Sequence, residues 1–287
     1  MARHSGKDPF SDQKAMATLQ SSLAKVFEAD HAVIAELVKE HVDFAISYPS
    51  ALRPGGRVLD FGCGIGDSVQ ALLDMGFDAW GVDVLEFWDR DIELLWEDRE
   101  KPPSEVAARL KTVSTDHYRL PFPDAHFDFC FSDQVMEHVF NLPVVMREIV
   151  RVLRPGAVSV HRFPGPNKPV EGHIFVPVIP LCRFRWYLAL WARLGIRSPR
   201  QQGLGWRETL ALNVETMRFC SYPTKNALRQ AAREANVTIE FHAGEGIKRQ
   251  KVGRAYTLFR AAESIGLGRV ALSLLSLVSQ RYVLIKG

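Results

Sequence analysis

A glycine loop flanked by two acidic residues is the segment of this chain best suited to hold a ligand. The sequence VLDFGCGIGD, residues 58–67, runs from an apolar stretch through Gly62, Gly64 and Gly66 into a helical pattern. Glycines let a backbone approach a ligand closely, and the start of a helix adds exposed N–H groups. A dinucleotide fingerprint needs glycine where Asp67 stands, and a carboxylate repels a pyrophosphate. The loop therefore favours a ligand with a positively charged end and no phosphate, the alternative being a purely structural turn.

Further acidic residues follow the strands expected after this loop. Asp83 ends the run AWGVD, 17 residues past Gly66, where an acid can accept hydrogen bonds from ribose hydroxyls. Asp116 follows the next expected strand, and Asp133 follows the buried run FDFCFS. Open α/β sheets bind ligands at the carboxyl ends of their strands, so these positions face a ligand.

The elements that must position these residues form an α/β pattern. Short apolar runs alternate with helical stretches from Arg57 onwards, which predicts parallel βαβ units. The expected fold is a Rossmann-like, open, mostly parallel seven-stranded sheet with helices on both faces. Predicted strands are 57–61, 78–83, 111–114, 127–132, 157–163, 237–241 and 282–286; predicted helices are 67–75, 90–97, 143–153 and 224–235, with a turn at Pro155-Gly156.

Breaks in this pattern predict four regions. Residues 1–54 form an N-terminal helical extension, because apolar residues recur at helical spacing over 11–48. Residues 55–163 form the ligand-binding α/β core. Residues 164–223 form an inserted lid with many prolines, and residues 224–287 complete the sheet.

The core motifs resemble one family when they are taken together. The series VLDFGCGIGDS, GVDV, STDHYRLPFPDAHFDFCFSDQVMEHV and LRPGAV, within residues 55–163, resembles class I S-adenosylmethionine-dependent methyltransferases, especially the ubiquinone/menaquinone methyltransferase-like (type 11) group. This resemblance implies S-adenosyl-L-methionine as cofactor. It implies that Gly62, Gly64 and Gly66 line its methionine part with Asp60 supporting the amino group, that Asp83 holds the ribose, that Asp116 faces the adenine with His117 nearby, and that Ser132 or Asp133 lies beside the sulfonium. His117 departs from the small residue common there.

Methyl transfer from a sulfonium needs alignment of donor and acceptor, and a hydroxyl acceptor also needs a base. We expect the base after the fifth strand, in VHRFPGPNKPVEGHIF, with candidates His161, Glu171 and His173. His173 and Glu171 are favoured as a pair, although each of the three could be a hydrogen-bonded loop residue. The histidines lack HxH or HExxH spacing, so no metal site is expected.

The insertion combines aromatic and basic residues. No acid lies between Glu171 and Glu208, and a helix is expected over 181–194. Three interpretations stay open: a lid with solvated arginines, arginines that bind an anionic acceptor, or peripheral membrane contact through 181–197. The apolar segment 267–278 is either part of such a face or core. Nucleic acid ranks last, because no binding motif is present.

Charge is divided unevenly along the 287 residues. Residues 1–171 hold 18 Lys and Arg against 27 Asp and Glu, and residues 172–287 hold 18 against 6. Four spaced cysteines and an N-terminus without an apolar run predict a reduced, cytoplasmic protein, with contact at the membrane surface as an option. We expect a methyltransferase for a small-molecule or lipid-linked acceptor, with transfer to oxygen. The alternatives are a non-catalytic S-adenosylmethionine-binding protein and an NAD-type oxidoreductase.

Overall fold

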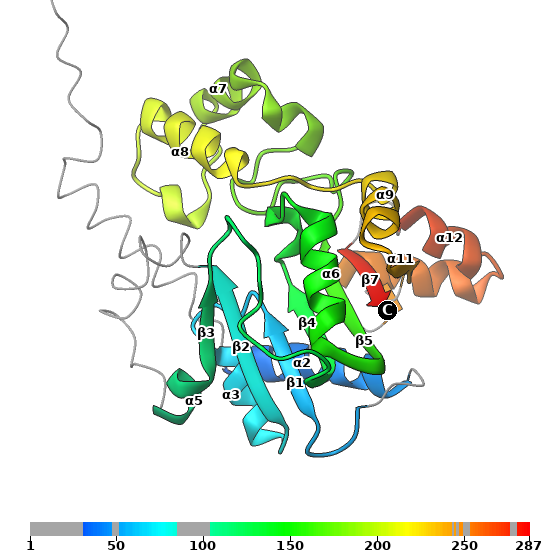
Figure 1. Cartoon of the computed structure of the whole chain (residues 1–287). Helices are drawn as coiled ribbons and strands as arrows, with labels where there is room; N and C mark the ends of the chain where they lie inside the picture. The colour runs from blue at the N-terminus through cyan, green and yellow to red at the C-terminus, as the bar shows by residue number, and fades with distance from the viewer. Residues whose placement is uncertain are drawn as a thin grey trace, which may run out of the picture. The chain divides into compact units, whose positions relative to one another are not determined.

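The computed structural model describes residues 31–47, 52–84, 104–242, 244, 247–248, 253–275 and 280–287. The chain divides into two compact units, which are drawn in Figure 1. The described residues of one unit are 169–219, inside the predicted insertion, and the other unit contains the described residues on either side of it. The predicted helical residues 11–30 and 90–97 lie outside the described residues.

The larger unit is built on one seven-stranded sheet with the order β3-β2-β1-β4-β5-β7-β6. The strands β1 to β5 run parallel, and β7 runs antiparallel to both of its neighbours. The predicted open, mostly parallel α/β fold is therefore confirmed. The strands are β1 (Arg57–Phe61), β2 (Asp78–Val84), β3 (Leu110–Val113), β4 (Phe127–Asp133), β5 (Leu153–Pro164), β6 (Thr238–Phe241) and β7 (Gln280–Lys286).

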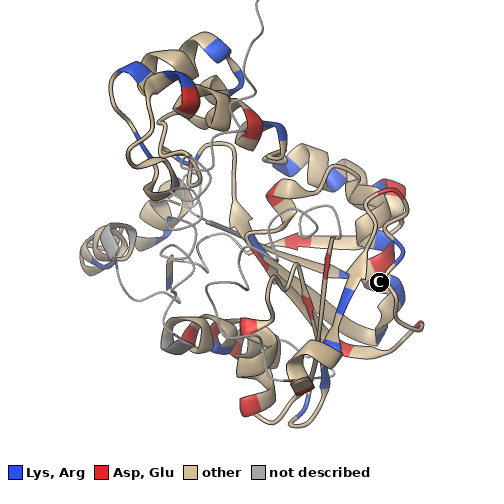
Figure 2. Cartoon of the chain, turned by 90° about the vertical axis from the view of Figure 1, so that its left-hand side faces the viewer, with Lys and Arg blue, Asp and Glu red and all other residues tan. Residues whose placement is uncertain are grey.

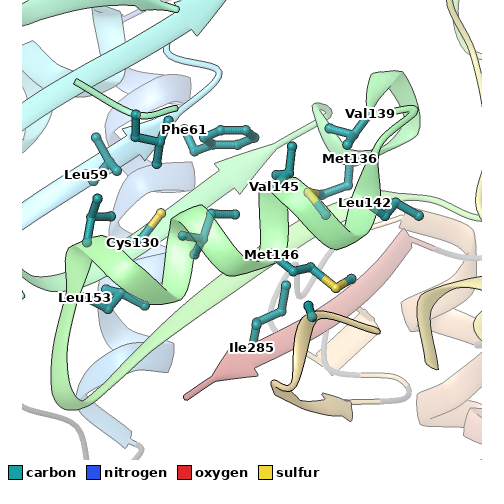
Figure 3. Close-up of a cluster of buried hydrophobic side chains, with 14 of the residues drawn as sticks. Leu59, Phe61, Cys130, Met136, Val139, Leu142, Val145, Met146, Leu153 and Ile285 are labelled. Atoms are coloured by element: carbon teal, nitrogen blue, oxygen red, sulfur yellow. The ribbon is translucent and has the colours of Figure 1, made fainter. Parts of the chain in front are cut away.

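Helices cover both faces of the sheet because the strand residues alternate between two apolar cores. Leu59 packs in one core with α6 (Leu142–Val152) and α9 (Lys225–Ala235), as Figure 3 shows for α6. Val58, the preceding residue, packs in the other core with α2 (His31–Ser47) and α3 (Asp67–Asp74). This period of two is the one expected for a strand buried on both faces. The hydroxyl of Thr224 accepts the Ala227 N–H at 3.1 Å and caps α9, as its sequence suggests.

Two features of the larger unit differ from expectation. The turn predicted at Pro155-Gly156 lies inside β5, which begins at Leu153; the pairing between β4 and β5 shifts register here. Gly156 has a positive φ of 80°, as a turn residue would, so Pro155-Gly156 forms an irregularity within the strand. The helices α5 (Ser104–Arg109), α11 (Gly253–Ser264) and α12 (Gly268–Leu275) were not predicted as such.

None of the helices in the described part of the chain combines the length and the apolar character that spanning a bilayer requires.

The smaller unit is helical. It contains the short 3-10 turns η2 (Ile179–Arg183) and η3 (Pro199–Gln201), and the helices α7 (Arg185–Arg193) and α8 (Trp206–Arg218). The single helix predicted over 181–194 is therefore two pieces, interrupted at Phe184. Its core contains Tyr187 and Leu188 of α7 and Leu210 of α8. Basic segments outnumber acidic ones in this unit, as Figure 2 shows by colour.

Apolar side chains are exposed on the smaller unit, where the sequence predicts contact with a membrane or with the acceptor. Around η2 and α7 the side chains of Phe184, Trp186, Leu190 and Leu194 are exposed. Trp186, Leu190 and Leu194 follow one another at intervals of four and lie on one face of the helical segment. The unit therefore carries an apolar stripe beside Arg183, Arg185 and Arg193.

Candidate functional site

The glycine loop joins β1 to α3 and is fixed against the end of β2. The N–H groups of Gly62 and Cys63 both donate to the carbonyl oxygen of Val82, at 2.8 and 3.2 Å. The Gly66 N–H donates to the Cys63 carbonyl at 3.0 Å, and Gly66 precedes the first residue of α3. Gly62, Gly64 and Gly66 have positive φ values of 84°, 53° and 94°. This left-handed backbone explains why glycines recur here.

Close packing adds a second reason for two of these glycines. A Cβ on Gly62 would lie 2.2 Å from Cγ2 of Val135, which follows β4. A Cβ on Gly66 would lie 3.0 Å from Cγ1 of Val106 in α5. Gly62 and Gly66 therefore allow neighbouring segments to approach the loop, whatever ligand it binds.

Asp83 connects the loop to the end of β2. Its Oδ2 accepts the N–H of Gly64 at 2.8 Å, and its Oδ1 accepts the N–H of Val84 at 2.7 Å. One carboxylate thus sets the conformation of the middle glycine and the exit of the strand. Two of the residues predicted to hold one ligand, Gly64 and Asp83, are in direct contact.

Three acidic side chains gather at the carboxyl ends of β1, β2 and β4. Asp60 is buried in β1, and its pKa is raised well above the ordinary value, first by burial and then by repulsion from Asp83 and Asp133. A hydrogen bond with Ser68 opposes this shift. Such a group of carboxylates favours a cation and disfavours a phosphate.

Asp133, at the end of β4, is held by an arginine of the neighbouring strand. Nε and Nη2 of Arg162 donate to its two carboxylate oxygens at 2.5 and 2.9 Å. Arg162 also lies 3.7 Å from Oε2 of Glu40 in α2. This bidentate pair fixes the orientation of Asp133.

Ser132 is buried beside a histidine of β5. Its Oγ lies 2.8 Å from Nδ1 of His161, and Nε2 of His161 lies 3.0 Å from Oγ of Ser159. The expectation that His161 follows the fifth strand is wrong, since it lies within β5 and is fully buried. That expectation also conflicts with the predicted strand range 157–163, which already includes His161. Burial lowers the pKa of His161 to about 3, so the imidazole is neutral near pH 7 and lacks the exposure that a loop base would have.

Asp116 and His117 lie on the exposed segment that follows β3. The Asp116 N–H donates to Oγ of Ser114 at 3.2 Å. Further along the same segment, Arg151 of α6 donates to the carbonyl oxygens of Leu120 and Phe122, both at 2.9 Å. The segment carrying Asp116 and His117 is therefore anchored on α6.

Glu171 and His173 lie in the smaller unit and are in contact. Nδ1 of His173 is 2.7 Å from Oε1 of Glu171, whose Oε2 accepts the N–H groups of His173 and Ile174, each at 2.7 Å. Glu171 is fully buried, whereas His173 is partly exposed. A carboxylate that orients an imidazole in this way is the arrangement that a histidine base requires.

Comparison with known proteins identifies a family for the part of the chain that contains the glycine loop. A family model described as "Methyltransferase domain" matches residues 59–160, which run from β1 into β5. Residues 59–160 are a class I S-adenosylmethionine-dependent methyltransferase domain of the type 11 group.

Three curated relatives each match less than half of this chain. A 2-phytyl-1,4-naphtoquinone methyltransferase of Synechococcus elongatus is 38% identical over 39% of this chain and 49% of its own. A 2-methyl-6-phytyl-1,4-hydroquinone methyltransferase of Synechocystis is 30% identical over 46% of this chain and 41% of its own. A ubiquinone/menaquinone biosynthesis C-methyltransferase of Ectopseudomonas mendocina is 30% identical over 44% and 49%. The chain thus spans half or less of the length of these relatives.

The sequence did not predict the residues that hold the candidate site residues and their segments in place. Arg162 orients Asp133, Ser159 completes the contacts of His161, and Arg151 anchors the segment before β4. One signal was available: Ser159, His161 and Arg162 are polar residues within the buried and otherwise apolar part of β5, residues 157–164. Buried polar groups need partners, so such residues indicate a hydrogen-bonded network.

Proposed function

We propose that this chain is an S-adenosylmethionine-dependent methyltransferase that acts on a small-molecule or lipid-linked acceptor. The observation that carries the proposal is the contact between Asp83 and the Gly64 amide. It joins the glycine loop to the acid near the end of β2, and both lie inside the matched domain.

The residues present fit this cofactor. Bound S-adenosylmethionine supplies a methyl group already activated on a sulfonium. Gly62, Gly64 and Gly66 would line its methionine part, and Asp60 would support its amino group. The carboxylates of Asp60, Asp83 and Asp133 favour a positively charged ligand, which argues against the NAD-type alternative.

The cofactor-binding part of the proposal is tested by calorimetry on the purified chain. Asp83→Asn should weaken S-adenosylmethionine binding at least tenfold, because the amide cannot match a carboxylate that accepts both backbone and ribose hydrogen bonds. The matched control is Asp74→Asn, an exposed aspartate of α3. Saturable NAD binding without S-adenosylmethionine binding would contradict the proposal.

Relatives narrow the class of acceptor. The names of three relatives specify a phytyl hydroquinone, a phytyl naphtoquinone and the ubiquinone/menaquinone series. We propose an acceptor of this chemistry, a ring that carries a lipid chain. Transfer to oxygen is the outcome predicted from the sequence, and transfer to carbon is favoured by the name of the Ectopseudomonas relative. The two products have the same mass, and proton NMR distinguishes them, because a methyl group on oxygen resonates well downfield of one on a ring carbon.

Within the smaller unit, we propose His173 as the base and Glu171 as its positioning residue. Glu171 holds Nδ1, which leaves Nε2 as the ring atom that takes the proton of the acceptor. His173→Gln should lower kcat most near neutral pH and leave cofactor affinity unchanged. An unaltered pH profile would exclude the role.

The arginines beside the apolar stripe of the smaller unit are proposed to bind an anionic part of the acceptor. Arg183→Glu together with Arg185→Glu should reduce turnover without changing cofactor affinity. Arg218→Glu, on an exposed arginine of α8, is the control. Labelled methyl transfer to quinols, phenols and acidic lipids tests the activity itself; cofactor binding without transfer to any of them would favour a non-catalytic binding protein.

A further inference from the structure

The helices α11 and α12 form a hairpin. In the sequence it lies between β6 and β7, two strands that pair with each other in the sheet. They pack on each other at the β6–β7 side of the sheet, as Figure 1 shows. Their connection is tight: the N–H of Leu267 donates to the Ala262 carbonyl at 2.8 Å, and Gly266 has a positive φ of 80°. The hairpin is therefore an ordered addition to the methyltransferase sheet.

The hairpin exposes an unusual amount of apolar side chain. Leu258, Ile265, Leu267, Val270 and Leu274 are each more than half exposed, and every residue of α12 is at least partly exposed. The core interpretation of segment 267–278 is therefore wrong for the described residues 267–275. The exposed residues recur at helical spacing: Leu258 of α11 is seven residues before Ile265, and Leu267, directly before α12, is followed by Val270 and Leu274. Several large apolar side chains exposed on one hairpin are typical of an interaction site.

The turn of the hairpin is also apolar. Ile265 is 71% exposed and Leu267 is 52% exposed, although surface turns usually carry polar residues. The most exposed apolar side chain of the hairpin thus lies at its turn. This arrangement suits insertion of a tip into an apolar medium.

Charge around the hairpin has one predominant sign. Residues 242–279 contain six Lys and Arg against two Glu. One of the two, Glu263, is paired with Arg260. Arg269, next to Val270, is exposed. Basic residues beside an apolar helical face are the composition of elements that lie in the interface of an anionic membrane.

We propose that the α11–α12 hairpin binds the surface of an anionic phospholipid membrane, with Ile265 and Leu267 inserted among the acyl chains. The helices have 12 and 8 residues and are too short to cross a bilayer. A second copy of the chain fits this surface less well. A twofold contact would bring the basic residues of 242–279 close to the same basic residues of the other copy, and like charges repel. The proposal concerns a surface outside the matched domain and does not depend on methyl transfer.

The test is co-sedimentation of the full chain with vesicles. Wild-type protein should bind vesicles of phosphatidylcholine with 30 mol% phosphatidylglycerol (about one anionic lipid in three) and should bind pure phosphatidylcholine more weakly, by about tenfold or more. Ile265→Ser with Leu267→Ser should weaken binding to the anionic vesicles at least tenfold. The matched control is Ile46→Ser with Phe140→Ser, two exposed apolar residues of the same unit outside the hairpin.

A charge variant tests the electrostatic part. Arg269→Gln should lower affinity for the anionic vesicles about fivefold, as expected for one basic residue near a charged surface, whereas Arg53→Gln should not. Unfolding curves and cofactor binding verify that the variants fold. Equal sedimentation of wild type and the tip variant would overturn the proposal, and so would a concentration-dependent dimer that the tip variant abolishes. Loss of methyl transfer with intact vesicle binding would contradict only the proposed function.

Discussion

Oγ of Ser132 donates a hydrogen bond to Nδ1 of His161 across 2.8 Å, and this direction follows from the rest of the network. The hydroxyl of Ser159 donates to the carbonyl oxygen of Ile285 at 3.2 Å, so its oxygen accepts from Nε2 of His161. The proton of the neutral imidazole is therefore on Nε2, and Nδ1 accepts. One continuous chain of hydrogen bonds links β4, β5 and β7.

This network predicts a pH-dependent stability. The pKa of His161 is about 3 in the folded chain against an ordinary value of 6.5, because burial disfavours the charged ring. The stabilisation that the neutral ring provides is fully present above pH 6.5 and is lost as pH falls toward 3. His161→Asn should reduce the slope of unfolding free energy against pH in this window by up to about 1.4 kcal/mol per pH unit. Urea titrations between pH 7 and 4 measure it, with His117→Gln, at an exposed position, as control; equal slopes for wild type and His161→Asn would contradict the assignment.

Asp60 predicts a proton-linked ligand affinity. Burial and the carboxylates of Asp83 and Asp133 raise its pKa, so the stability of the free protein falls as pH rises through that raised value. A positively charged cofactor favours the ionised carboxylate, so its binding should release protons and tighten with rising pH. Calorimetry in two buffers of different ionisation enthalpy measures this release. It should vanish in Asp60→Asn and persist in Asp74→Asn; proton release that survives Asp60→Asn would assign it to another group.

The close approach of Gly62 to Val135 predicts that substitutions at these two residues have coupled effects on the free energy of unfolding. Gly62→Ala should destabilise the chain by roughly 2 kcal/mol or more, since the new Cβ meets Val135 and the backbone is left-handed. Gly156→Ala isolates the backbone contribution, because Gly156 has a similar φ with open space around it, and should cost about 1 kcal/mol. Val135→Ala removes the side-chain atoms nearest the new Cβ and should restore part of the loss. A double-mutant cycle checks this, and strict additivity would exclude the clash.

We expect the hydrogen bonds of Arg151 to stabilise the exposed segment after β3. It donates to two carbonyl oxygens of that segment and is paired with Glu148 and Asp124. Arg151→Lys should cost about 2 kcal/mol and speed amide exchange over residues 114–126, because lysine cannot make these bonds together. Arg147→Lys is the control on the same helix, since Arg147 makes one carbonyl contact, with Glu234. Unchanged exchange in Arg151→Lys would show that the segment is held by its other contacts.

Glu171 predicts the local stability of the smaller unit. Glu171→Gln keeps one oxygen for the backbone N–H groups of His173 and Ile174 but loses the acceptor for the imidazole. It should cost about 1–3 kcal/mol and speed proteolysis near residues 171–178. Glu171→Ala removes all three contacts and should cost more. Equal stability of the two variants would contradict the assigned contacts.

Much of the sheet was predictable because its strands are apolar runs bounded by Gly, Pro or Asp. The range 57–61 matches β1, and 127–132 matches all but the last residue of β4. The start of β5 was missed, because Pro155-Gly156 has turn chemistry and lies within a register shift, between Leu153 and Val158, which both pair with β4. An apolar run alone also does not indicate its burial, so the segment that contains α12 could be interpreted as core or as surface.

The site was predictable to a similar degree. The residues at strand ends were placed correctly in order, and Asp83 meets the glycine loop. The partners that orient them were not predicted. Arg162 contacts Asp133 from another strand, and Glu40 contacts Arg162 from a helix far away in sequence. Register between distant strands, which sets these contacts, leaves no local pattern in the chain.

The pairing of β6 with β7 has a consequence for how this chain could be divided. Phe241, the last residue of β6, pairs with Val283 of β7, so the connection that contains the hairpin leaves and re-enters the sheet at neighbouring points. A short turn could close the same gap without disturbing either strand. We therefore expect the sheet and its glycine loop to fold when the hairpin is shortened, lengthened or replaced.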